Sequence, residues 1–318
     1  MSRINPERST SMASRRNVLT AALLLVLLAS YPTAAPKYSD WSAPLNLGAV
    51  VNSPFNDAGP AISKDGLSLY FGSDRPGGFG GFDIWISQRA GLEAPWDSPI
   101  NLGAVVNTSG IENVPALSRD EHWLFFNSNR TGGFGGNDIW VSYRVHIQDD
   151  SGWQPPVNLG AGVNTSFVDQ GASYLQNDGA GASLLWFNSD RPGGMGAADI
   201  YVSQLLPNGS FGPPSLVPQL SSPAQDARPS VRFDGLEVVM FSSRVGSLGG
   251  FDLWAATRET AFDPWSIPVN LGPVVNSTAN DQQPYIAADR RTLHFASDRA
   301  GGFGQLDLYV TIRSRQQP

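Results

Sequence analysis

The sequence predicts an all-β fold, a five-bladed β-propeller with four-stranded antiparallel blades. One sequence block recurs five times, and each copy lies in a unit that reads as four short strands. The strand that the fifth unit lacks stands instead near the front of the chain. The 34 glycines and 24 prolines among 318 residues suit a chain of short strands and turns.

The recurring block is long and specific. Its first copy, Ser73–Trp85, reads Ser-Asp-Arg-Pro-Gly-Gly-Phe-Gly-Gly-Phe-Asp-Ile-Trp, and later copies begin at Ser128, Ser189, Ser242 and Ser297. Successive copies therefore lie 55, 61, 53 and 55 residues apart, which fits a four-stranded blade with long loops. We expect the repeats at 55–103, 110–160, 167–220, 224–272 and 279–312.

Within the first unit, residues 60–63 and 67–72 read as two strands joined by the turn Lys64-Asp65-Gly66. The glycine-rich segment 75–81 reads as a loop, because glycine weakens strand interiors. Residues 83–87 and 96–103 supply the third and fourth strands.

The two ends of the chain predict closure of the ring. The fifth unit stops after its third strand at residue 312, whereas residues 41–48 match 96–103 and 265–272. We expect this N-terminal strand to complete the last blade. Such closure protects the strand edges that an open array would expose.

The first 35 residues differ from the rest. They combine four arginines, an apolar run at 18–29 and small residues before 36, the layout of a secretory signal peptide. Ser14–Leu19 also resembles a twin-arginine signal. An uncleaved anchor is the alternative, although the apolar run is short for a membrane span. We expect an exported domain at 36–318, in the periplasm or outside the cell.

The composition of the chain limits the classes of molecule that it is expected to bind. The net charge of −7 disfavours nucleic acid and anionic lipid. No apolar run of 18 residues follows residue 36, so we expect no membrane span in the mature chain. The absence of cysteine excludes disulfides and an acylated N-terminal cysteine. A monomer that binds an envelope protein or peptide, or a cell-wall glycan, is expected.

Three charged positions recur in every unit, and we call each such set of equivalent residues a column. An acidic column stands before the first strands: Asp57, Glu112, Asp169, Asp226 and Asp281. An arginine column follows the second strands: Arg75, Arg130, Arg191, Arg244 and Arg299. Aspartates open the third strands: Asp83, Asp138, Asp199, Asp252 and Asp307.

The first column is expected to ring one mouth of the central channel, since first strands are innermost in a propeller. Five like charges there need arginine partners, a ligand, or a cation such as calcium. Folding requirements recur in every blade, so a structural role is the main expectation for two of the columns. The third-strand aspartates are expected to accept hydrogen bonds from glycine-loop amides or from the arginines, and the arginines to pair with one of the two acidic columns. For the acidic column before the first strands, a ligand or cation role stays open beside the structural one.

An apolar column occupies the tips of the glycine loops: Phe79, Phe134, Met195, Leu248 and Phe303. These side chains are expected either to form an exposed rim that binds a partner or to fold down as plugs between loops.

Catalytic residues are not apparent. The three histidines, His122, His146 and His294, are not expected on the rim that carries the glycine loops. Neither a Ser-His-Asp triad nor a histidine-rich metal site is therefore predicted. Glycosidases need carboxylates in different roles, and in the acidic column Glu112 alone departs from aspartate.

The pattern Pro-x-x-Ser-x-Asp-Gly, an aromatic strand, Ser-Asp-Arg and Asp-Ile-Trp resembles the WD40-like repeats of TolB-type propellers, over residues 41–312. That resemblance implies an envelope protein without a catalytic constellation. The leading expectation is therefore a non-enzymatic exported scaffold that binds a protein or peptide. The alternative is a glycan-binding or glycoside-hydrolase-like propeller that uses the carboxylates at the channel mouth.

Overall fold

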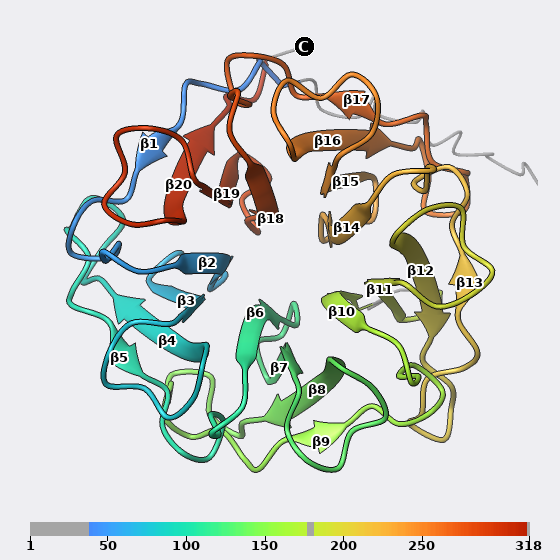
Figure 1. Cartoon of the computed structure of the whole chain (residues 1–318), viewed down its shortest axis with the longest axis horizontal. Coiled ribbons are helices and arrows are strands. Elements are labelled where there is room, and N and C mark those ends of the chain that lie inside the picture. The colour runs from blue at the N-terminus through green and yellow to red at the C-terminus, as the bar shows by residue number, and fades with distance from the viewer. Residues whose placement is uncertain (1–37, 177–180, 317–318) are drawn as a thin grey trace, which may run out of the picture. The chain divides into compact units, whose positions relative to one another are not determined.

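The structure, a computed structural model, describes residues 38–176 and 181–316. Within these ranges the secondary structure consists of strands, arranged as five four-stranded antiparallel sheets around a central axis (Figure 1). The predicted five-bladed propeller is thus confirmed. No helix of the described part is long and apolar enough to cross a membrane. The predicted leader at 1–35 lies outside the described residues.

Every blade has three strands of six or seven residues and a two-residue outer strand. Blade 1 consists of β2 (Asp57–Ile62), β3 (Ser68–Ser73), β4 (Asp83–Gln88) and β5 (Ile100–Asn101). Blade 2 consists of β6 (Glu112–Leu117), β7 (Trp123–Ser128), β8 (Asp138–Tyr143) and β9 (Val157–Asn158). Blade 3 consists of β10 (Asp169–Leu175), β11 (Leu184–Ser189), β12 (Asp199–Gln204) and β13 (Ser215–Leu216). Blade 4 consists of β14 (Asp226–Val231), β15 (Glu237–Ser242), β16 (Asp252–Thr257) and β17 (Val269–Asn270). Blade 5 consists of β18 (Asp281–Ile286), β19 (Thr292–Ser297), β20 (Asp307–Ile312) and β1 (Leu45–Asn46).

The N-terminal strand closes the ring as predicted. β1 pairs antiparallel with β20, with Leu45 opposite Val310, and the innermost strand β18 contacts β2. The outer strand is much shorter than 41–48, and the Asn52 side chain adds to its pairing with β20. Its amide group exchanges hydrogen bonds of 2.8 and 3.1 Å with the backbone of Leu308.

The core is repeated from blade to blade. The central residue column of the second strands is almost fully buried: Phe71, Phe126, Phe187, Met240 and Phe295. The ring column of the third strands, for example Trp85 and Tyr309, is at most 7% exposed. Alternating apolar side chains thus pack within and between blades, which makes the loops and the axis a rigidly supported face.

Candidate active site at the propeller axis

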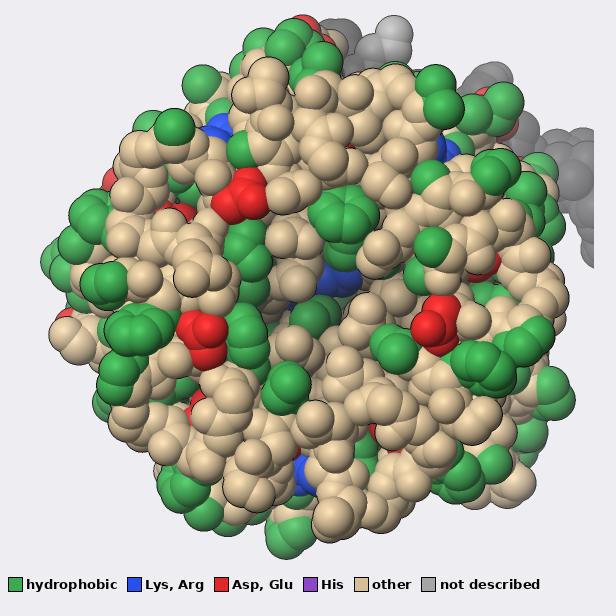
Figure 2. All heavy atoms as spheres, in the orientation of Figure 1, with side chains coloured by type: hydrophobic (Ala, Val, Ile, Leu, Met, Phe, Trp, Pro, Cys, Tyr) green, Lys and Arg blue, Asp and Glu red, His purple; other side chains and the backbone are tan. Residues whose placement is uncertain are grey.

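A hollow lies at the centre of one face of the propeller (Figure 2). Acidic side chains stand around the hollow, and basic atoms are visible inside it. The charged columns differ in how exposed their side chains are.

The predicted acidic column lies beneath the mouth, with side chains that are 0% exposed. These residues open the innermost strands instead of preceding them. Asp169, for example, accepts the Thr165 amide at 2.6 Å and the Thr165 hydroxyl at 2.8 Å, and pairs with Arg191 at 2.5 Å. The structure therefore places these carboxylates in separate blades, each against its own arginine. Their predicted role in ligand binding stays a prediction.

The arginine column completes this lock. Arg244 reaches Asp226 at 2.5 Å, the Leu220 carbonyl at 2.7 Å and the face of Trp254 at 5.3 Å. One guanidinium thus joins the connection from the previous blade, the innermost strand and the third strand. Removing one partner of such a buried pair leaves an uncompensated charge, at a cost of about 3–5 kcal/mol.

The third-strand aspartates hold the glycine loops. Asp83 accepts the Phe79 amide at 2.5 Å and the Asn101 side chain at 2.9 Å. A Cβ on Gly78 would stand 2.0 Å from the Asp83 carboxylate, so a larger residue there would displace the carboxylate from the Phe79 amide. The loop tips Phe79, Phe134, Met195, Leu248 and Phe303 are fixed by their backbones while their side chains remain 46–50% exposed.

A second acidic set is more exposed than the acidic column, and the sequence analysis missed it. Asp74 is half-buried, and Asp190 and Asp298 are exposed. Each accepts the amide of the residue that precedes an innermost strand, at 2.6–2.7 Å. Blades 2 and 4 carry Asn129 and Ser243 in the same column. The sequence did contain a signal: the position directly before each arginine of the arginine column varies between aspartate, asparagine and serine, whereas the arginine is the same in all five repeats.

The axis itself is built from bulges. In every innermost strand the register shifts after the second residue. The residue that follows has a positive φ in all five blades, from 44° to 71°: Gly59, Val114, Gly171, Arg228 and Gln283. A positive φ strains a residue other than glycine, and such strain concentrates at functional sites.

Arg228 is the basic residue among these innermost strands, and it crosses the channel. Its Nη2 donates to the Pro60 carbonyl at 2.7 Å and to the Pro115 carbonyl at 3.3 Å. We call the hollow at the propeller axis the funnel. Asp74, Asp190 and Asp298 are hydrogen-bonded to the residues that enter the innermost strands around it, and Arg228 belongs to one of these strands.

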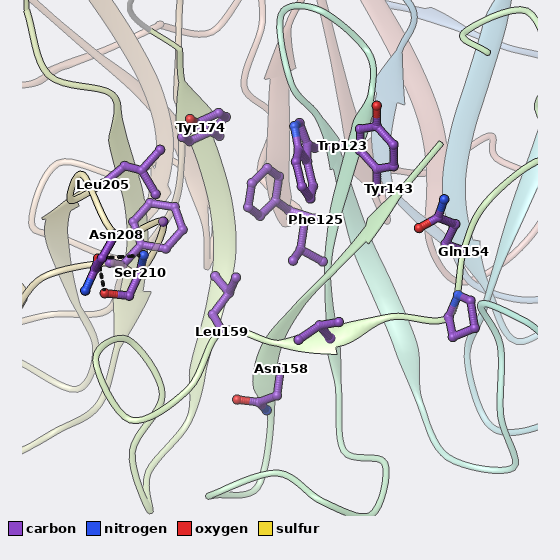
Figure 3. Close-up of a pocket in the computed structure, with 15 residues that line it drawn as sticks. Trp123, Phe125, Tyr143, Gln154, Asn158, Leu159, Tyr174, Leu205, Asn208 and Ser210 are labelled. Atoms are coloured by element: carbon purple, nitrogen blue, oxygen red, sulfur yellow. Dashed lines mark hydrogen bonds between the residues drawn. The ribbon is translucent and has the colours of Figure 1, made fainter. Parts of the chain in front are cut away.

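A separate groove of about 930 Å³ opens between blades 2 and 3 (Figure 3). Trp123, Phe125 and Tyr143 from blade 2 line one side, and Leu205 and Phe211 from blade 3 line the other. In the other four blades an arginine lies 4.1–4.5 Å from the ring of a tryptophan at these two positions. Blade 3 lacks that pair, which leaves the groove open.

A metal site is not evident in the described part of the chain, where no group of three or more histidine, cysteine, aspartate or glutamate residues could hold an ion. The predicted calcium ion at the acidic column stays a prediction, which a melting experiment with and without calcium would test.

No protein-family model matches the sequence, and no curated protein matches it either. Solved structures do match the fold. An α-L-arabinofuranosidase from Podospora anserina, solved with cellotriose, is 13% identical with a TM-score of 0.55, over 89% of this chain and 98% of that one. An α-L-arabinofuranosidase from Lactobacillus brevis is 13% identical with a TM-score of 0.57, over 85% and 94%. An endo-arabinase from Bacteroides thetaiotaomicron is 14% identical with a TM-score of 0.54, over 88% and 99%.

These matches correct two expectations. The TolB-type assignment is wrong, because the solved structures that match this chain over nearly their whole length are α-L-arabinofuranosidases and an endo-arabinase. The expectation of a non-enzymatic protein-binding scaffold is overturned with it. The comparisons favour the alternative, a glycoside-hydrolase-like propeller, and at these identities they establish the shared fold.

Proposed function

We propose that this chain is a glycan-processing propeller that binds a carbohydrate over the funnel and hydrolyses a glycosidic bond there. The observation that carries the proposal is the accessible rim of Asp74, Asp190 and Asp298, alternating with Asn129 and Ser243. Carboxylates, amides and hydroxyls pair with sugar hydroxyls, and the matched arabinofuranosidases support the same class of substrate.

Hydrolysis requires one carboxylic acid and one carboxylate. The acid protonates the glycosidic oxygen as the bond to the anomeric carbon breaks. The carboxylate takes a proton from the water whose oxygen bonds to that carbon. The rim offers carboxyl groups in two settings, which could separate these roles.

Asp74 is the better candidate for the fixed base. The Asn56 amide holds its Oδ1 at 2.7 Å, and the Asn56 side chain holds its Oδ2 at 2.8 Å. Asp298 is held in the same way by Asn280. Asp190 accepts the Val168 amide at its Oδ1, and the valine side chain has no donor for its Oδ2. The Oδ2 of Asp190 can therefore donate a proton to a leaving group. We assign the proton donor to Asp190.

A glycan array and a panel of aryl glycosides test the proposal. We expect binding on the array and release of the aryl alcohol from at least one pentoside or hexoside. Silence in both assays would overturn the proposal.

The proposed location is outside the cytoplasm, where cell-wall glycans occur. The signal-peptide pattern of residues 1–35 supports export to the periplasm or the medium. Cell fractionation, with N-terminal sequencing of the mature chain, should find a new terminus close to Pro36; an intact N-terminus in the cytoplasm would contradict export.

A further inference from the structure

Arg228 differs from the arginines that surround it. It is 4% exposed, and no carboxylate of the described residues lies within ion-pair distance of its guanidinium. Its Nη1 is buried with no hydrogen-bond partner. A buried charge without a counter-ion is costly, and a buried donor without an acceptor adds to that cost.

Glycines of blades 1 and 3 make room for this side chain. A Cβ on Gly59 would stand 2.9 Å from Arg228 Nη1, and a Cβ on Gly171 would stand 3.0 Å from the Arg228 Cα. Asn188 of blade 3 accepts the Arg228 amide at 3.0 Å and so fixes the strained backbone, whose φ is 44°. Together with the carbonyls of Pro60 and Pro115, residues of blades 1, 2 and 3 therefore hold Arg228 at the axis.

Arg228 lies on an innermost strand beside the axis, and its side chain retains 4% exposure. Figure 2 shows basic side-chain atoms inside the central hollow that the innermost strands surround. The cavity that Arg228 lines with Tyr285 within the channel is only about 10 Å³, roughly the space of one water molecule. A ligand group larger than water must therefore reach Arg228 from the open mouth.

A second unmet group lies at the same level. Gln283 occupies the equivalent bulge in the neighbouring blade 5, and its Oε1 is buried without a partner. A guanidinium donor and an amide on two contacting innermost strands, β14 and β18, match a carboxylate that carries an adjacent hydroxyl, as in a uronic acid. Burial lowers the pKa of Arg228 to about 9, so the guanidinium still carries its charge at neutral pH.

We propose that Arg228 binds the carboxylate of an acidic sugar, so that the glycan processed at the funnel contains uronic acid. This inference rests on the proposed function and adds the class of substrate. A free monoanion such as chloride or acetate has the same charge and is the other source of an Arg228-dependent signal.

The experiment compares oligogalacturonides with neutral galactose oligomers of equal length, by calorimetry on the full mature chain. We expect the acidic oligomers to bind at least tenfold more tightly, since hydrogen bonds to charged groups are the strong ones. The variant Arg228→Gln should lose this preference and keep its affinity for neutral oligomers. Arg291→Gln, which removes an exposed arginine beyond the innermost strands, is the matched control and should behave as wild type.

Three results would overturn the inference. Equal binding of acidic and neutral oligomers by the wild type would remove the uronate preference while leaving the proposed function intact, and it needs no variant. Saturation of the same site by chloride or acetate, with no further gain from uronate, would assign Arg228 to a free anion. Failure to bind either oligomer, with no activity on any glycoside, would remove the proposed function as well.

Discussion

The funnel and the groove both break the fivefold repeat, but in opposite ways. At the axis, blade 4 adds Arg228 where blades 1 and 3 carry glycine. Between blades 2 and 3, Leu205 and Phe211 replace the arginine–tryptophan pair of the other blades. The addition leaves a buried charge with an unmet donor, whereas the replacement leaves space with apolar walls. A ligand can supply the counter-ion and the acceptor that Arg228 lacks in the described part of the funnel. A larger side chain can fill the empty space of the groove.

The largest expected effect separates the two regions by activity. Asp190→Asn should lower kcat on a cleaved glycoside by about 10²–10⁴-fold, because it removes the proposed proton donor without changing shape. Initial rates on the aryl glycoside measure the effect. Asp97→Asn, an exposed aspartate outside the funnel, is the control and should retain full activity. Unchanged turnover in Asp190→Asn would place the chemistry elsewhere.

The next effect concerns the support beneath the funnel. Asp169→Asn leaves Arg191 without its buried counter-ion, and we expect a loss of about 3–5 kcal/mol in the free energy of unfolding. Urea denaturation measures this loss. Asp190→Asn, which changes an exposed carboxylate one strand away, should cost about 1 kcal/mol or less. Similar losses in the two variants would mean that the buried aspartate–arginine pairs do not stabilise the structure beneath the funnel.

A third effect concerns the interface between blades 5 and 1, where an arginine–tryptophan pair fills the gap. His294 is buried there; burial and the nearby Arg89 lower its pKa to about 4, from the usual 6.5. Between pH 4 and pH 6.5, His294 is therefore protonated in the unfolded chain but neutral in the folded chain. Stability is present above pH 6.5 and falls as the pH drops toward 4.

Between pH 7 and pH 4.5 this group should cost about 2–3 kcal/mol of unfolding free energy. Urea midpoints at the two pH values measure the loss. In His294→Phe the loss of unfolding free energy between the two pH values should be about 2–3 kcal/mol smaller than in the wild type. Phenylalanine should fit there, since blades 2 and 3 carry Phe125 and Trp186 at this position. An identical pH dependence in wild type and variant would contradict a neutral, buried His294.

The ring and its closure were predictable because they depend on residues that recur in every blade. Matching 41–48 to 96–103 was enough to place β1 beside β20. The same attention to recurring residues made Asp57 and its equivalents the candidate site. In the structure these carboxylates are buried and form ion pairs with arginines. The position of Arg228 depends on a bulge, and a change of register cannot be read from alternating side chains.

The smallest effect tests whether the groove is simply an unfilled interface. Leu205→Arg with Phe211→Trp restores the pair found in the other blades, and it should stabilise the fold by about 1 kcal/mol, raising Tm by roughly 2–4 °C. Each single substitution should gain less than half of this, because the cation and the ring act together. Thermal melts of the three variants measure the coupling. Hydrolysis at the funnel should not change. A double variant that is destabilised, or that loses activity, would show that blade 3 keeps the groove open for a ligand and would end the contrast between the two regions.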